Sequence, residues 1–130
     1  MALVNDFVLG CDWTPNSSNV ATLLDSGDVS IYYDGTNISM IKGAAVGSMV
    51  FPVVAGTTYS IKGRISSTQG VDIFAEDVKG TNDADVSDAT PSAILQIGCT
   101  EALTEHINGN IKNVFIVKGD LDNDEVIALP

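Results

Sequence analysis

The sequence predicts an all-β protein: a single antiparallel β-sandwich, jelly-roll-like, with about eight strands, formed by residues 1–130. Three observations lead to this fold class. Helical periodicity is nearly absent along the chain. Short runs rich in β-branched residues alternate apolar and polar side chains, as strands with one buried face do. Clusters of Gly, Asp, Asn and Pro separate these runs and mark turns.

Length and composition fit one globular domain with a sizeable core. The chain has 130 residues, of which 45% are hydrophobic and 18% are charged, and a domain of this size buries roughly two-thirds of its surface. It carries 17 acidic and 6 basic residues, for a formal net charge of −11. Such a surface repels the phosphates of nucleic acids and of anionic membranes, so neither is an expected partner.

The first quarter of the chain contains a strand candidate and a loop. Residues 2–9 (ALVNDFVL) are a first strand candidate, and residues 11–19 (CDWTPNSSN) are typical of a loop, with Pro15 as a breaker. Residues 19–25 (NVATLLD) are compatible with a strand or with a single helical turn.

Residues 28–43 (DVSIYYDGTNISMIKG) are the clearest local unit. Apolar and polar side chains alternate from Val29 to Tyr33, and Asp34-Gly35 supplies a turn that tolerates positive φ. The alternation then continues on the return. This pattern predicts a β-hairpin.

The stretch 53–66 (VVAGTTYSIKGRIS) predicts a tight turn at Gly56 followed by a half-buried strand. The apolar, glycine-rich stretch before it, residues 43–56, contains Pro52, which cannot donate to a sheet and so marks a strand end, a bulge or an edge. The alternation after the turn assigns one set of side chains to the core and the other to solvent. We expect Tyr59, Ile61 and Ile65 to be buried, and Lys62 and Arg64 to be exposed.

The second half of the chain continues the pattern of strands and polar loops. Its expected elements are a strand over 71–77, a long acidic loop over 78–92, a strand over 93–99, an ambiguous segment over 100–110 that is compatible with one helical turn, a strong strand over 111–119, and an acidic then apolar ending over 120–130.

Two stretches carry a resemblance to a known type of domain. Residues 53–70 (VVAGTTYSIKGRISSTQG) resemble the strand–turn–strand unit of jelly-roll domains of the carbohydrate-binding-module type, and residues 111–121 (IKNVFIVKGDL) resemble their last strand. The resemblance covers residues 28–119 in arrangement and 53–70 in detail. It implies a structural role for Tyr59, with its ring in the core and its hydroxyl toward a backbone partner. Galactose-binding-like lectins, fibre and tail domains of tailed bacteriophages and capsid decoration proteins share such sandwiches, so the fold does not select a function.

Aromatic side chains are the expected sugar-binding groups in domains of this type, because the faces of pyranose rings stack on them. Only 6% of the residues are aromatic. The two candidates for glycan stacking are Trp13, in the predicted loop, and Tyr32, which points away from the inferred core face of its hairpin.

Two acidic clusters are candidate calcium sites, because calcium prefers several oxygen ligands. Neither cluster has the Gly and the distal Glu of an EF-hand loop, and solvated acidic turns are the alternative interpretation. The candidate ligands are Asp83, Asp85 and Asp88 in the first cluster, with Asp77 nearby, and Asp120, Asp122 and Asp124 in the second.

No catalytic constellation emerges from the sequence. His106 is the only histidine, and the chain has no nucleophile elbow, so an enzyme is not expected. The cysteines, Cys11 and Cys99, lie far apart without metal-ligand spacing, which favours reduced, buried thiols. No cofactor is expected apart from the calcium candidates.

By exclusion and resemblance, the sequence favours a non-enzymatic virion protein of a bacteriophage, either a capsid decoration (cement) protein or a head or tail fibre component. The expected partners are other virion proteins such as the major capsid protein. The start MALVNDFVLG is no signal peptide, which predicts synthesis in the host cytoplasm before assembly into the virion. The alternative function is a carbohydrate-binding module that recognises glycans through Trp13 or Tyr32.

Apolar residues at both ends of the chain predict self-assembly. The stretches MALVNDFVLG and EVIALP require cover, either from their own sheet or from a neighbouring subunit. A symmetric homo-oligomer, with a trimer favoured, buries them between subunits. The alternative is a monomer whose ends pair within its own sandwich.

Overall fold

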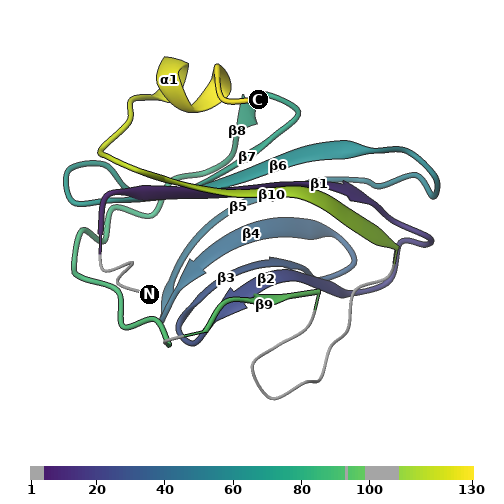
Figure 1. Ribbon diagram of the computed structural model, residues 1–130, viewed down its shortest axis with the longest axis horizontal. Coiled ribbons are helices and arrows are strands. Elements are labelled where there is room, and N and C mark those ends of the chain that lie inside the picture. Colours follow the sequence, from purple (N-terminus) through teal and green to yellow (C-terminus); the bar gives the residue numbers. More distant parts are fainter. Residues whose placement is uncertain (1–4, 93, 99–108) are drawn as a thin grey trace.

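The structure is a computed structural model that describes residues 5–92, 94–98 and 109–130, and it shows two antiparallel sheets packed face to face (Figure 1). Sheet A has the strand order β10-β1-β6-β7-β8, and sheet B has the order β5-β4-β3-β2-β9. The predicted antiparallel sandwich is confirmed. The strands are β1 (Phe7–Thr14), β2 (Ala21–Ser26), β3 (Val29–Tyr33), β4 (Asn37–Lys42), β5 (Ala45–Val50), β6 (Tyr59–Ser66), β7 (Gly70–Ala75), β8 (Val78–Lys79), β9 (Gln96–Ile97) and β10 (Asn110–Lys118).

The core lies between the two sheets and contains the side chains that the alternation assigned to it. Tyr59, Ile61 and Ile65 of β6 are all buried, as predicted. The Tyr59 ring packs edge-on against Phe51, with 5.0 Å between ring centroids. Its hydroxyl accepts a hydrogen bond of 2.8 Å from the backbone N–H of Val54. The structural role implied for Tyr59 by resemblance is therefore confirmed.

The hairpin over 28–43 is also present, as β3 and β4. The Asp34 carboxylate organises the turn, because it accepts hydrogen bonds from the backbone N–H groups of Thr36 and Asn37. These bonds, that from Asn37 first, lower the pKa of Asp34 below its usual value. Strand β5 ends at Val50, two residues before Pro52, which confirms the strand end expected there.

The boundary predicted for the first strand was wrong. Strand β1 continues to Thr14, through four residues assigned to a loop, because it lies in the middle of sheet A and pairs with β10 on one side and β6 on the other. Residues 21–26 form strand β2, which decides between the two interpretations of that stretch. In the later half, β9 covers only two residues of the predicted strand over 93–99. Most of the ambiguous segment over 100–110 lies outside the described residues.

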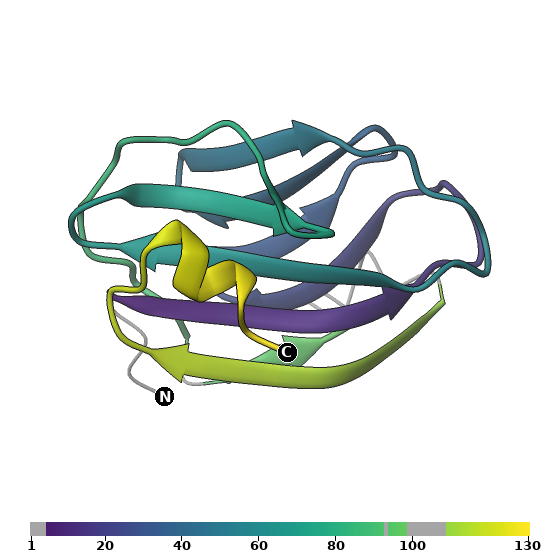
Figure 2. The ribbon, with the colours of Figure 1, turned by 90° about the horizontal axis from the view of Figure 1, so that it is seen from above.

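A short helix, α1 (Asn123–Ile127), closes the described chain and was not predicted. Asp122 caps it by accepting a hydrogen bond from the backbone N–H of Glu125, whose carboxylate accepts one from the N–H of Asp122. This reciprocal capping box stabilises a helix of a single turn. Figure 2 shows α1 lying across the outer face of sheet A, above β6 and β1. No helix in the described part of the chain is long and apolar enough to cross a membrane.

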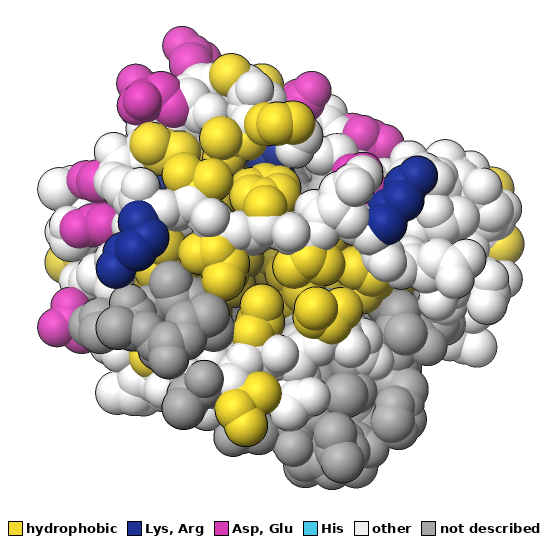
Figure 3. Space-filling model, viewed as in Figure 1, with side chains coloured by type: hydrophobic (Ala, Val, Ile, Leu, Met, Phe, Trp, Pro, Cys, Tyr) yellow, Lys and Arg dark blue, Asp and Glu magenta, His cyan; other side chains and the backbone are white. Residues whose placement is uncertain are grey.

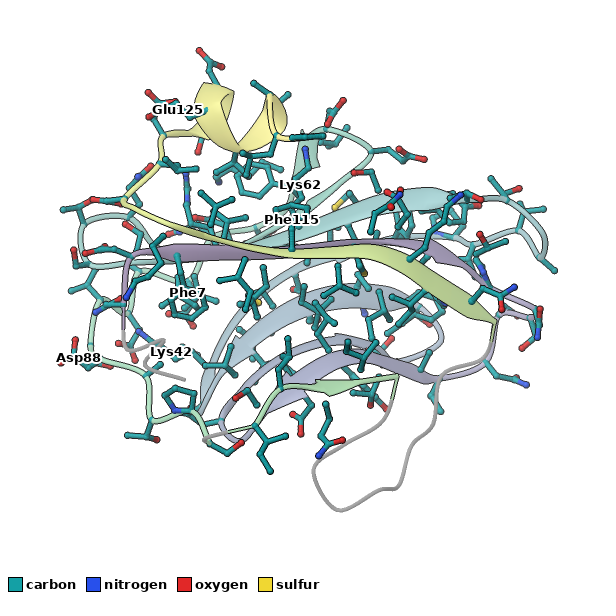
Figure 4. All side chains as sticks on the ribbon, viewed as in Figure 1. Phe7, Lys42, Lys62, Asp88, Phe115 and Glu125 are labelled. Carbon is teal, nitrogen blue, oxygen red and sulfur yellow. The ribbon has the colours of Figure 1, made fainter. Side chains whose placement is uncertain are left out.

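The helix explains why the prediction that Lys62 and Arg64 are exposed was wrong. Both point to the outer face of sheet A, as their positions in β6 require, but the C-terminal segment covers them and their exposed fractions are only 3% and 1%. Figure 4 shows Lys62 between the sheet and α1. Its ammonium donates to the backbone carbonyls of three residues at the end of this segment, Val126, Ile127 and Leu129, at 3.1, 3.1 and 2.6 Å.

Arg64 is held by partners on both sides of its guanidinium. Its Nε donates to the buried carboxylate of Asp72 at 3.2 Å, and one terminal nitrogen donates to the carbonyl of Leu121 at 3.1 Å. The guanidinium also lies 5.3 Å from the centroid of the Phe74 ring. Beside it, Val126 of α1 is fully buried in a small cluster with Val8 and Phe74. The apolar C-terminal end is therefore covered by its own sheet.

Candidate functional site

The outer face of sheet B presents a row of hydroxyl side chains around one tyrosine. Because Val29, Ile31 and Tyr33 of β3 point into the core, Ser30 and Tyr32 point outward. Across the sheet, the residue pairs Thr22–Tyr32, Tyr32–Ser39 and Ser39–Ser48 place four side chains side by side on β2, β3, β4 and β5. Tyr32 is half-buried in the middle of this row, which we call the tyrosine–serine row.

One member of the tyrosine–serine row has an unused hydrogen-bonding group. The hydroxyl of Thr22 is buried, and it has no hydrogen-bond partner among the described residues. Buried polar atoms without a partner are rare in folded proteins, so this hydroxyl is an unusual feature of the row. The Tyr32 ring provides a partly exposed stacking surface, whereas Thr22 and Ser39 beside it are only 1% and 8% exposed.

Trp13, the second glycan candidate, has a different environment. Its side chain is fully buried, and its ring packs against that of Tyr33 with 5.5 Å between centroids. In sheet A, Trp13 pairs with Tyr59 on one side and Ile111 on the other. A buried indole offers no face to a sugar, so in this structure Trp13 belongs to the core.

The first acidic cluster forms the turns of the loop that follows β8. Asp83 accepts hydrogen bonds from the backbone N–H groups of Val46 and Asp85, at 3.1 and 3.0 Å. Asp85 accepts from the N–H and the hydroxyl of Ser87. Asp88 accepts from the side chain of Asn5 at 2.8 Å.

This loop wraps around a buried lysine of β4. The ammonium of Lys42 donates to the carbonyls of Asp85 and Ser87 and lies 3.3 Å from the Asp85 carboxylate. The bonds from Ser87, and then the contact with Lys42, lower the pKa of Asp85 to about 2. This carboxylate and Lys42 therefore attach the loop to one end of the sandwich.

The second acidic cluster attaches the C-terminal segment to sheet A. Asp120 accepts hydrogen bonds from the side chains of Ser66, Thr68 and Gln69 in the turn between β6 and β7, and the first two are the main reason why its pKa is lowered. Asp122 caps α1, and Asp124 lies in its first turn. In the described part of the chain, no three carboxylate, His or Cys side chains are placed to share a metal ion. The structure gives both clusters roles in turns and in helix capping, and calcium binding by either of them stays a prediction from the sequence.

An open groove lies beside strand β10, on the side of sheet A that carries α1. It has a volume of about 440 Å³ and is lined by Asp12, Asn113, Phe115, Val117, Leu129 and Pro130. Strand β10 contains an irregularity here: its register against β1 shifts between Gly10 and Asp12, and Asn113 has a φ of 54°. The Asn113 amide donates to the Asp12 carboxylate at 2.8 Å, which fixes this bulge.

The ring of Phe115 forms part of the groove and requires a glycine beneath it. An added Cβ on Gly10 would come within 2.3 Å of the ring, so a larger residue there would require the phenyl group to move from this position. This groove was not predicted from the sequence. The available signal was the apolar stretch VFIV in residues 111–119, with a lysine near each end.

The reactive residues considered earlier provide no catalytic site among the described residues. Cys11 is a buried free thiol, and burial, followed by the charge of Asp12, raises its pKa to about 12, so a thiolate is not available at neutral pH. His106 and Cys99 lie outside the described residues.

Comparison with solved structures finds the same fold in several sugar- and receptor-binding proteins. The SAP-like pentraxin from Limulus polyphemus superposes with a TM-score of 0.72 at 15% identity, over 95% of this chain and 69% of the pentraxin chain. The CBM40 of Ruminococcus gnavus IT-sialidase has a TM-score of 0.72 at 16% identity, over 96% of this chain and 82% of the CBM40 chain. The receptor binding domain of botulinum neurotoxin type G has a TM-score of 0.64 at 15% identity, over 95% of this chain and 37% of the toxin domain.

These similarities identify a jelly-roll β-sandwich and, at such low identity, no more than the fold. No protein-family model and no curated protein sequence matches this chain.

Proposed function

We propose that this protein is a non-catalytic glycan-binding domain, with the tyrosine–serine row on the outer face of sheet B as its binding surface. The observation that carries the proposal is the position of Tyr32, which is half-buried on the outer face between the hydroxyl side chains of Thr22 and Ser39. An aromatic ring stacks on the apolar face of a sugar, and a tyrosine hydroxyl both donates and accepts hydrogen bonds at its polar edge.

The structural similarities support this proposal over the other functions considered. One of the similar structures is the CBM40 of Ruminococcus gnavus IT-sialidase bound to α2,3-sialyllactose, with a TM-score of 0.70 at 15% identity. The sandwich of this chain is therefore a scaffold on which another protein holds a glycan. The sugar that this chain binds is a separate question, because fold similarity does not transfer ligand contacts.

A glycan array followed by titration of the best ligand tests the proposal. Replacing Tyr32 by Ala removes the stacking ring and should weaken binding about tenfold, whereas Tyr32→Phe keeps the ring and should retain most of the affinity. Val54→Ala is the matched control, because Val54 is 63% exposed and lies outside this face. If the folded protein binds no sugar on the array, or if Tyr32→Ala binds as tightly as the parent, the proposal is wrong.

A structural role in a bacteriophage virion is the second candidate. The feature that favours an assembly function is the open edge of sheet A, where β10 exposes Ile116 and ends the row of strands. The apolar C-terminal end no longer supports oligomer formation, because α1 already packs against Val8 and Phe74 of its own sheet. Co-sedimentation with purified virus particles, and the trimer expected in analytical ultracentrifugation, test this candidate.

A further inference from the structure

We propose that the tyrosine–serine row binds neutral glycans and discriminates against acidic ones, such as sialylated, sulfated or uronic-acid sugars. This inference rests on the proposed glycan-binding function and adds the chemical class of the sugar to it. Three features of the molecule support it: the placement of the basic side chains, the acidic side chains beside Tyr32, and the aliphatic surface next to its ring.

The lysines and arginines of this protein lie away from the outer face of sheet B. The sequence contains six of them. Five belong to strands of sheet A, namely Lys62, Arg64, Lys79, Lys112 and Lys118. Figure 3 shows basic side chains on the face of the molecule that β10 crosses. Because packed sheets lie about 10 Å apart, these groups do not reach a sugar on the far side of sheet B.

The sixth basic residue, Lys42, belongs to sheet B but points to the inner side of the sheet. It pairs with Val29, which is buried in the core, so both side chains point inward. Its ammonium donates hydrogen bonds to the carbonyls of Asp85 and Ser87. Since all six residues lie in the described part of the chain, an acidic sugar beside Tyr32 meets no lysine or arginine with which to pair.

Acidic side chains flank Tyr32 on its own face and in its own hairpin. Asp25 of β2 pairs with Ser30, which lies two residues before Tyr32 and points outward with it. Asp34 is exposed and lies two residues after Tyr32, and hydrogen bonds in its turn, that from the backbone of Asn37 first, lower its pKa. Two residues along a strand span about 7 Å, which is within the Debye length of about 8 Å at physiological salt. The ionised Asp34 therefore repels an anionic sugar at Tyr32.

An aliphatic surface continues from the row next to Tyr32. Ile41 of β4 pairs with Ser30 on one side and with Val46 of β5 on the other, so these three side chains lie side by side on the outer face. Val46 is 40% exposed. Such a surface extends the area on which the apolar face of a neutral sugar packs, whereas an ionised group placed there loses water without gaining a partner. The net charge of −11 acts in the same direction.

A glycan array with matched sets tests the inference on the unmodified protein. Each set contains a neutral glycan, the same glycan capped by α2,3-linked sialic acid, and the methyl ester of the sialylated form, which keeps the size of the cap but removes its charge. We expect the sialylated member to bind about fivefold more weakly than the neutral member, and the ester to regain most of this loss. Because salt screens charges, the discrimination should be smaller in about 1 M salt than in about 0.01 M salt.

Two variants test whether the local charge sets this preference. Ser30→Lys places a cation two residues from Tyr32 on the same face and should strengthen binding of the sialylated glycan about fivefold relative to the neutral one. Val78→Lys adds the same charge on β8 of sheet A, at a position that is 56% exposed, and should leave the ratio of the two affinities unchanged. Thermal melts show whether both variants are folded.

The possible results distinguish a failure of this inference from a failure of the glycan-binding function. If the array binds no glycan, that function is wrong and the inference falls with it. If binding depends on Tyr32 but sialylated glycans bind as tightly as neutral ones, or more tightly, only the inference is wrong. It is also wrong if the methyl ester binds as weakly as the sialylated form, since the size of the cap then explains the loss, or if Val78→Lys changes the ratio as much as Ser30→Lys.

Discussion

Replacing Lys62 by methionine tests whether the C-terminal segment is held to sheet A by the buried ammonium. Methionine keeps the unbranched side chain and its packing but removes the three hydrogen bonds to the carbonyls of Val126, Ile127 and Leu129. Hydrogen bonds from a charged donor contribute about 1.5–3 kcal/mol each, or roughly 5–9 kcal/mol for three. Burial of the ammonium opposes this by several kcal/mol. We therefore expect Lys62→Met to lower the free energy of unfolding by about 2–4 kcal/mol.

Urea unfolding followed by fluorescence measures this loss as a shift of the midpoint with an unchanged slope. Amide exchange should also accelerate in α1, because the segment loses its main attachment. The control is Lys112→Met, an exposed lysine on β10 for which the change should stay within about 0.5 kcal/mol. A loss below about 0.5 kcal/mol for Lys62→Met, or equal losses for both variants, would show that the ammonium does not hold the segment.

Two further predictions concern stability. Tyr59→Ala removes a buried ring and its hydrogen bond to Val54, and it should cost about 3–5 kcal/mol in urea melts; a loss under about 1 kcal/mol would reject the assignment of Tyr59 to the core. The pKa of Asp120 is lowered in the folded protein, so the stability that this carboxylate provides is present above about pH 4 and is lost as the pH falls through its folded-state pKa. Thermal melts of Asp120→Asn should show a smaller loss of melting temperature between neutral and acidic pH than melts of the parent protein, and equal losses would contradict this role.

The sequence predicted those elements whose signal is local. The hairpin of β3 and β4 is an example, because alternation from Val29 to Tyr33 and a turn at Asp34-Gly35 are both contained within a few residues. The burial of Tyr59 could be predicted for the same reason. Alternation predicts that neighbouring side chains point to opposite faces of a sheet, but it does not predict which other parts of the chain cover each face.

The wrong predictions arise where a segment far away in the sequence determines whether a residue is buried. Lys62 and Arg64 lie on the outer face as predicted, yet the C-terminal segment with its short helix, some sixty residues later in the chain, buries them. That helix is too short to show a helical period, although its capping pair, Asp122 and Glu125, could be recognised in the sequence. Trp13 lies in β1 and not in the predicted loop, because pairing with β6 and β10 extends this strand to Thr14, directly before the breaker Pro15.

The candidate site was predictable only in part. The outward position of Tyr32 follows from the alternation in its hairpin, whereas its neighbours in the tyrosine–serine row depend on the register of four strands. The groove at β10 depends on a bulge at Asn113, on the absence of a side chain at Gly10 and on the path of the C-terminal segment. None of these pairings can be derived from local periodicity.

The positions of the buried cations limit where a ligand can bind. On the outer face of sheet A, the C-terminal segment that contains α1 covers Lys62 and Arg64 and accepts hydrogen bonds from both, and at one end of the sandwich the loop around Asp85 does the same for Lys42 (Figure 4). Tyr32, which carries the glycan proposal, lies on the other sheet, half-buried on the outer face of sheet B. A ligand bound there therefore meets a phenol ring and not one of these three cations, so the affinity of a glycan ligand should depend on the ring of Tyr32 and should not change in Lys62→Met.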